Sequence, residues 1–163
     1  MLKRGELFQD GYSLQRFPLG AEYLRKLKAD VLNSDWESVD REFAAMTRPG
    51  GVWFDFLRGF HDFSSIETMI SIRDAENEWE EDGIWHDDGS RVFAFSLSLT
   101  LDPARMEGGC LELRRKGIDG HSTLIPTPEF GTAILFLTGI HGYEHRTRKV
   151  EKGKRVILVG WCT

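Results

Sequence analysis

Beyond Gly51 the chain alternates short apolar stretches with turn residues, and no helical pattern separates one stretch from the next. Strands that follow one another through tight turns pair antiparallel, because a parallel pair needs a long crossover connection. We therefore expect an antiparallel sandwich in this part of the chain, and a parallel α/β fold is excluded. The expected strands cover residues 66–73, 91–101, 110–114, 122–126, 132–137 and 155–162.

The part of the chain before Gly51 has a helical pattern instead. Apolar residues recur at the spacing of one helix face within residues 21–32, and charged residues fill the opposite face. A second helix is expected over residues 34–46, with Ser34 or Asp35 as its N-cap. The sequence thus predicts a single domain over residues 1–163, with helical support in residues 1–50 and a β core in residues 51–163.

The composition is that of a globular protein, with 40% apolar, 29% charged and 12% aromatic residues. The formal net charge of −5 offers no positive field to phosphates, so a nucleic-acid partner is disfavoured. No window approaches the roughly 18 apolar residues that a membrane-spanning helix needs, and residues 1–6 do not open an apolar leader. We expect a cytoplasmic protein without a membrane partner. Cys110 and Cys162 match no zinc or redox spacing.

The clearest chemistry lies in the sequence Trp85-His86-Asp87-Asp88-Gly89. In an extended segment, residues i and i+2 point to the same side, so His86 and Asp88 can bind one ion while Asp87 faces away. Two histidines and one carboxylate on one face of an octahedron are the ligands of non-haem iron(II) oxygenases, which keep their other positions open. The motif therefore predicts two of the three ligands of an iron site.

The third ligand must be a histidine from elsewhere, and the motif by itself leaves His61, His121, His141 and His145 as candidates. His145 precedes Arg155 by ten residues, with a Lys-Gly turn between them, so these two can lie near each other on paired strands. A guanidinium binds a carboxylate through two parallel hydrogen bonds. 2-Oxoglutarate has such a carboxylate at its distal end, while its 2-oxo acid end suits the open positions of the metal.

These residues resemble the motif of the Fe(II)/2-oxoglutarate-dependent dioxygenases, in particular their prolyl-4-hydroxylase-like branch. In that branch His-x-Asp is followed by a distant His, ten residues later by Lys or Arg, and then by Trp. Here the pattern falls on His145, Arg155 and Trp161, whereas His141 has no basic residue at that interval. Further likenesses are residues 7–12 to the opening strand of the family, Gly108-Gly109 to its Gly-Gly strand, and residues 128–131 to its Pro-x-x-Gly turn.

The resemblance implies a mainly β fold with flanking N-terminal helices, the double-stranded β-helix or jelly roll that is also found in cupins. It implies Fe(II) as the metal, 2-oxoglutarate as the co-substrate and O2 as the oxidant. The site residues that it implies are His86, Asp88 and His145 as catalytic metal ligands and Arg155 as the co-substrate anchor.

The chain departs from the branch in two places. Where many relatives have Tyr-Leu-Asn, with the tyrosine in contact with the co-substrate, this chain has Ser98-Leu99-Thr100. Ser98 is therefore expected to donate that hydrogen bond, from a shorter side chain. Residues 108–111 are Gly-Gly-Cys-Leu instead of Gly-Gly-Glu-Thr, which alters the expected wall of the pocket.

We expect a hydroxylase that couples 2-oxoglutarate decarboxylation to oxidation of a C–H bond, on an amino-acid side chain that is free or part of a protein. One alternative is a sensory module that binds the metal and 2-oxoglutarate without turnover. Another is a cupin-type metalloenzyme that does not use 2-oxoglutarate and includes His141 among its ligands. The sequence leaves open the oligomeric state, the roles of His141, Arg73 and Trp161, and whether residues 78–85 cover the site as a lid.

Overall fold

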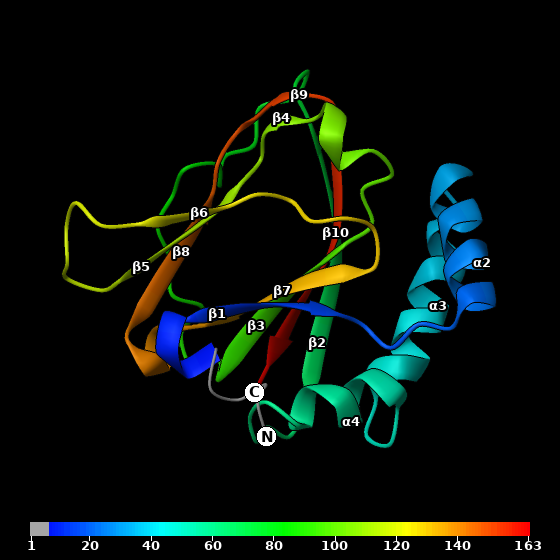
Figure 1. Ribbon diagram of the computed structural model, residues 1–163, viewed down its shortest axis with the longest axis horizontal. Coiled ribbons are helices and arrows are strands. Elements are labelled where there is room, and N and C mark those ends of the chain that lie inside the picture. Colours follow the sequence, from blue (N-terminus) through cyan, green and yellow to red (C-terminus); the bar gives the residue numbers. More distant parts are fainter. Residues whose placement is uncertain (1–6) are drawn as a thin grey trace.

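The computed structural model describes residues 7–163, which form two layers of β sheet with helices on one side (Figure 1). Five strands make the major sheet in the order β1-β7-β3-β10-β2, and all neighbouring strands run antiparallel. The central strands are β3 and β10, and β2 is an edge. These strands are β1 (Tyr12–Arg16), β2 (Ile66–Asp74), β3 (Phe93–Ser98), β7 (Thr132–Leu137) and β10 (Lys154–Cys162).

A minor sheet of three antiparallel strands, in the order β6-β5-β8, faces the major sheet, and β4 and β9 form a separate short pair. The expected antiparallel sandwich is confirmed, and its two sheets make the jelly roll. The remaining strands are β4 (Glu107–Gly108), β5 (Leu111–Arg115), β6 (Thr123–Ile125), β8 (Tyr143–Thr147) and β9 (Val150–Lys152), and two short 3-10 helices are η1 (Pro103–Arg105) and η2 (Gly139–His141).

Three helices lie against the face of the major sheet that is turned away from the minor sheet (Figure 1). Helix α2 (Ala21–Leu32) has the predicted bounds, and α3 (Trp36–Thr47) follows Asp35, whose side chain accepts the Ser38 N–H at 3.3 Å. Helix α4 (Val52–Arg58) is absent from the prediction, because seven residues are too few to show a helical period. The helical part therefore continues past residue 50. No helix within residues 7–163 is long and apolar enough to cross a membrane.

The strands agree with the sequence prediction in part. Residues 132–137 coincide with β7, and the other expected strands overlap β2, β3, β5, β6 and β10. Residues 7–10 are helical, so the opening strand placed at residues 7–12 begins only at Tyr12. Strands β4 and β9 are absent from the prediction, and the strand expected at His145 is β8, which continues to Thr147. Residues 1–6, where the sequence shows no apolar leader, lie outside the described residues.

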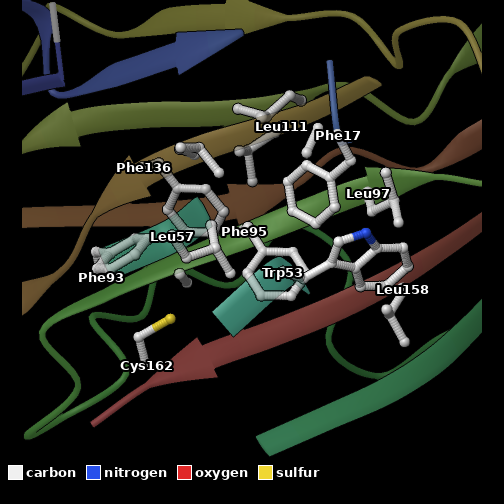
Figure 2. Close-up of a cluster of buried hydrophobic side chains, with 14 of the residues drawn as sticks. Phe17, Trp53, Leu57, Phe93, Phe95, Leu97, Leu111, Phe136, Leu158 and Cys162 are labelled. Carbon is white, nitrogen blue, oxygen red and sulfur yellow. The ribbon is translucent and has the colours of Figure 1, made fainter. Parts of the chain in front are cut away.

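The aromatic part of the hydrophobic core lies on the helix side of strand β3. The ring of Phe95 points toward the helices and packs against Phe17, with ring centroids 5.3 Å apart, in a cluster that includes Trp53 (Figure 2). Successive side chains of a strand point to opposite faces, so Ser96 and Ser98 face the minor sheet. The helix side of the major sheet therefore holds the aromatic cluster, and the polar residues of its other side are available for a site.

Replacing Gly160 tests this packing. Gly160 of β10 lies opposite Phe95 in the sheet, and a Cβ there would stand 2.1 Å from atoms of the Phe95 ring. Because the ring is fully buried, Gly160→Ala should lower the free energy of unfolding by about 1–3 kcal/mol. Urea denaturation measures this change. Gly20→Ala, where no atom lies within 4 Å, is the control and should cost less than about 1 kcal/mol. Equal effects would contradict the assigned packing.

Candidate metal centre

His86, Asp88 and His145 converge in the space between the two sheets. One ligand atom from each lies within 4.8 Å of the others, and no other such group of three occurs within residues 7–163. The Asp88 carboxylate stands between the imidazoles, with Oδ1 3.5 Å from Nε2 of His86 and Oδ2 3.3 Å from Nε2 of His145. The three side chains thus offer two nitrogens and one carboxylate to a single point.

Backbone hydrogen bonds hold the two histidines together. The N–H of His86 donates to the carbonyl of His145 at 2.9 Å, and the N–H of His145 donates to the carbonyl of His86 at 2.8 Å. His145 belongs to β8, where it pairs with Leu113 of β5. The two imidazole centroids lie 4.2 Å apart. The segment before Asp88 is therefore attached to the minor sheet at the ligands themselves.

Asp88 reaches the site through a turn. The sequence predicts an extended segment over residues 86–88, but Asp88 has a left-handed backbone with φ of 60°. The Asp87 carboxylate accepts the Gly89 N–H at 2.9 Å and stabilises this turn. Aspartate adopts the left-handed conformation more readily than most residues. His86 and Asp88 therefore meet for a different reason than the alternation of a strand.

Asp87 faces away from the ligands and fixes the turn to its surroundings. Its carboxylate pairs with Lys116, and that hydrogen bond is the main cause that lowers the pKa of Asp87. Its backbone carbonyl accepts the Gly139 N–H at 2.9 Å. A Cβ on Gly139 would lie 2.8 Å from the Asp87 side chain, so the close approach of η2 requires a glycine.

The donor atoms fit a divalent metal ion. Nδ1 of His86 lies 3.0 Å from the Ile84 carbonyl, and a hydrogen donated there leaves Nε2 free as a ligand. Asp88 Oδ2 is buried without a hydrogen-bond partner, a position that a bound cation satisfies. Burial raises the pKa of Asp88, which a cation would reverse. Burial, and next the charge of His86, lowers the pKa of His145 to about 3, so this imidazole stays neutral and can bind metal.

Arg155, near the start of β10, points into the same cavity and is only 2% exposed. Its Nε donates to Thr127 Oγ1 at 3.3 Å, and no ion pair within residues 7–163 involves its guanidinium. Burial, followed by the charge of Arg73, lowers the pKa of Arg155 to about 10, which still leaves it charged at neutral pH. A Cβ on Gly109 would stand 3.2 Å from Arg155 Cδ, so the Gly-Gly sequence leaves room for this side chain.

His145 and Arg155 lie on opposite walls of the cavity. The expectation that they sit on paired strands is wrong, because β8 pairs with β5 in the minor sheet and β10 pairs with β2 and β3 in the major sheet. Between them the chain forms β9, which pairs with β4. Both residues nevertheless line one cavity. The space between the metal ligands and the guanidinium is therefore enclosed by both sheets.

The cavity has a volume of about 80 Å³, and Ser96 of β3 lines it together with Arg155 and the histidine ligands. Ser98 faces the same way but is fully buried and outside the lining, and its Oγ accepts the Thr100 N–H at 3.4 Å. The serine that reaches the cavity is therefore Ser96. The sequence analysis missed Ser96 and Thr127, although the alternation of β3 places both serines on one face.

The other histidines lie elsewhere. His141 is in η2, with Nε2 3.0 Å from Nε2 of His61, and neither residue belongs to the cluster of three ligands. His121 is exposed in the loop before β6. Of the four candidates for a third ligand, the structure brings only His145 to the His86-x-Asp88 motif.

The two tryptophans named in the sequence analysis have different surroundings. Trp161 lines the cavity, and a hydrogen bond from its side chain opposes the burial that raises the pKa of Asp88. Trp85 instead packs against Arg114 and Arg146, whose guanidinium carbons lie 3.9 and 4.5 Å from ring centroids of the indole. Trp161 is therefore part of the site, and Trp85 supports the chain beside it.

A family model of the 2OG-Fe(II) oxygenase superfamily matches residues 73–163, which is more than half of the chain. The matched segment contains the three metal-binding candidates, Arg155 and Trp161. No curated protein matches the chain significantly.

Solved structures with a similar fold include prolyl hydroxylases. A Pseudomonas putida prolyl-4-hydroxylase is 21% identical, with 99% of this chain and 92% of that chain covered and a TM-score of 0.61. A prolyl 4-hydroxylase from Phytophthora capsici is 14% identical, with coverage of 98% and 61% and a TM-score of 0.63. A Trichoplax adhaerens prolyl hydroxylase, in complex with a peptide fragment of hypoxia inducible factor, is 12% identical, with coverage of 98% and 86% and a TM-score of 0.56. These likenesses confirm the jelly roll.

A pair of histidine variants tests the ligand set. His145→Ala removes a nitrogen from the cluster and should weaken Mn²⁺ binding by at least about 100-fold, because even supporting residues of metal ligands contribute 10–100-fold. His141→Ala leaves the cluster intact and should change the affinity by less than about threefold. Calorimetric titration with Mn²⁺, which replaces Fe(II) without oxidising, measures both. Equal losses, or a larger loss in His141→Ala, would contradict the geometry.

Proposed function

Because the chain belongs to the 2OG-Fe(II) oxygenase superfamily, we propose that it hydroxylates a C–H bond of an amino-acid side chain, with His86, Asp88 and His145 as its iron ligands and Arg155 as its co-substrate anchor. The enzyme is a dioxygenase that uses Fe(II), 2-oxoglutarate and O2. One observation carries the residue assignment: the only cluster of three ligands in residues 7–163 faces an unpaired, buried guanidinium within one cavity.

Arg155 suits the distal carboxylate of 2-oxoglutarate. A buried guanidinium without an anion is unfavourable, and a carboxylate that binds through two parallel hydrogen bonds removes the cost. Thr127 Oγ1 lies 3.3 Å from Arg155 Nε and can add a hydrogen bond to the same carboxylate. Because the metal ligands are on the opposite wall, a dicarboxylate held by Arg155 directs its 2-oxo acid end toward them.

Bound Fe(II) supplies the activation of O2, and the residues of the chain hold and shield the reactants. The ring of Phe136 packs against the imidazole of His145, with centroids 4.7 Å apart, and restricts its rotation. Leu111 and Phe136 line the cavity and keep water from its inner end. Among the three ligands only Asp88 is a carboxylate, so a bound divalent ion would keep a net positive charge for the co-substrate.

Amino-acid residues are the substrate class that we propose. The similar solved structures are prolyl hydroxylases, and one of them holds a peptide. The net charge of −5 argues against a nucleic-acid substrate. We also propose a cytoplasmic location.

The role of Arg155 has a direct test. Arg155→Ala should weaken 2-oxoglutarate binding by about 30-fold or more, because removing one partner of a buried charged pair costs about 2–5 kcal/mol. Titration of the Mn²⁺-loaded protein under nitrogen measures the affinity, and succinate formation from the Fe(II)-loaded protein in air measures turnover.

Arg25→Ala is the matched control, since Arg25 is an exposed residue of helix α2 outside the cavity and should leave both readouts unchanged. An unchanged 2-oxoglutarate affinity in Arg155→Ala would favour a cupin-type enzyme without this co-substrate. Tight binding in the parent protein without any oxygen-dependent succinate would favour a sensory module instead.

A further inference from the structure

Arg73 is a second guanidinium of the cavity. It lies directly opposite Arg155 in the pairing of β2 with β10, and it lines the cavity with the histidine ligands. Only 12% of its side chain is exposed. Like charges opposite each other in a sheet repel, and the charge of Arg73 contributes to the lowered pKa of Arg155. The cavity therefore has one buried cation, Arg155, and a second, largely covered one, Arg73, and each can pair with an anion.

The side-chain partners of Arg73 all come from one connection, residues 75–85, which we call the strap. The Asp82 carboxylate forms an ion pair with the guanidinium, and the Asp82 side chain is also only 12% exposed. Glu81 lies 3.8 Å away, and the ring centroid of Trp79 lies 5.6 Å from the guanidinium carbon. Nε of Arg73 is buried without a hydrogen-bond partner. Arg73 thus holds the strap through the Asp82 carboxylate, and its Nε–H can still donate a hydrogen bond.

The strap crosses from one wall of the cavity to the other. It leaves the end of β2 in the major sheet, and the Gly83 N–H donates to the carbonyl of Thr147 in β8 at 2.9 Å. Arg146 donates to the Gly83 carbonyl at 3.3 Å. Glu81 is one of the residues that line the cavity. The acidic segment whose role the sequence leaves open therefore covers the site.

A substrate requires the strap to move. The cavity of about 80 Å³ is well below the roughly 300 Å³ or more of ordinary small-molecule sites. A co-substrate and a substrate side chain do not fit together in that volume. Residues 75–81 are exposed, so the buried contact that movement breaks is the pair between Asp82 and Arg73.

Breaking this pair has a chemical consequence. A guanidinium that loses its carboxylate while it stays buried is strongly destabilised, more so beside a second guanidinium. The distal carboxylate of 2-oxoglutarate cannot pair with Arg73 instead, because Arg155 binds it. A substrate that carries its own carboxylate restores the pair at Arg73, and a neutral substrate does not.

We propose that Arg73 recognises a carboxylate of the substrate and that Asp82 occupies the same place while no substrate is bound. The inference rests on the proposed function and narrows its substrate class to acidic amino-acid derivatives. The carboxylate belongs either to the oxidised residue itself or to a neighbouring residue of a peptide.

Two matched pairs of probes test the proposal. N-acetyl-L-proline and N-acetyl-L-prolinamide differ only in the charge of the terminal group. Two proline tripeptides that carry either aspartate or asparagine beside the proline, both with amidated ends, differ only in a side chain. Each probe is titrated into protein saturated with Mn²⁺ and 2-oxoglutarate, and amide hydrogen exchange of residues 75–85 reports displacement of the strap. The pair that discriminates identifies the source of the carboxylate.

In the unmodified protein, the acidic probe of one pair should displace the strap at a concentration about tenfold or more below the concentration that its neutral partner needs. Arg73→Gln should reduce this preference to within about twofold, because neither form finds a cation. Asp82→Asn should lower the concentration at which the strap is half displaced by the same factor for the acid and the neutral probe. The preference for the acid should remain, since this variant removes only the carboxylate that competes with the probe for Arg73. Glu80→Gln, an exposed acid of the same strap, should change neither.

If Arg73 only anchors the strap, acid and neutral probes act alike in the parent protein and in Asp82→Asn, and that result overturns the proposal even if Arg73→Gln fails to fold. A preference that survives in Arg73→Gln also overturns it. Failure of the proposed function is separate, because it appears as absent 2-oxoglutarate binding or absent succinate, whereas strap exchange can be read without turnover.

Discussion

The reciprocal backbone hydrogen bonds between His86 and His145 are the interaction on which the site depends. They are an isolated bridge, yet they attach the segment before Asp88 to the edge of the minor sheet. Neither ligand could be placed by its own element alone, since His86 belongs to a connection and His145 to a three-stranded sheet. Because each histidine donates to and accepts from the other, any shift of β8 moves both ligands together, and the geometry of the site is kept.

The charges of the cavity are separated by its two walls. The carboxylate of Asp88 lies with the histidines of the minor-sheet side, and the guanidinium groups of Arg73 and Arg155 lie on adjacent strands of the major sheet. In such a cavity 2-oxoglutarate has one favourable orientation, with its distal carboxylate at the guanidinium and its 2-oxo acid end at the metal. Burial strengthens this preference, because charges at 2% and 12% exposure are weakly screened by water.

The sequence predicts which residues are the metal ligands, but it does not predict the backbone geometry that brings them together. His86 and Asp88 follow from their motif, but the left-handed turn at Asp88 depends on Asp87, Lys116 and η2, which no local pattern links. His145 follows from its interval to Arg155, although the two lie in different sheets. A strand at His145 was expected, but its pairing with β5 was not, because no local pattern links these two strands. Arg146 of β8 forms an ion pair with the buried Glu112 of β5 at 2.6 Å. Burial alone would raise the pKa of Glu112. The hydrogen bonds from Arg146, Ser122 and Arg148 instead lower this pKa to about 2.

The register of β10 joins the stability of the fold to the site. Its alternate residues line the cavity, namely Arg155, Ile157, Val159 and Trp161. Leu158 and Cys162 pack in the core (Figure 2). Gly160 lies against the ring of Phe95. A slip by one residue would turn the guanidinium into the core and place a side chain against Phe95. The same register fixes Arg155 opposite Arg73, a like-charged pair that folding alone gives no reason to bury. The packing of the aromatic core fixes the register of β10, and this register fixes the position of Arg155, the proposed binding site of the 2-oxoglutarate carboxylate.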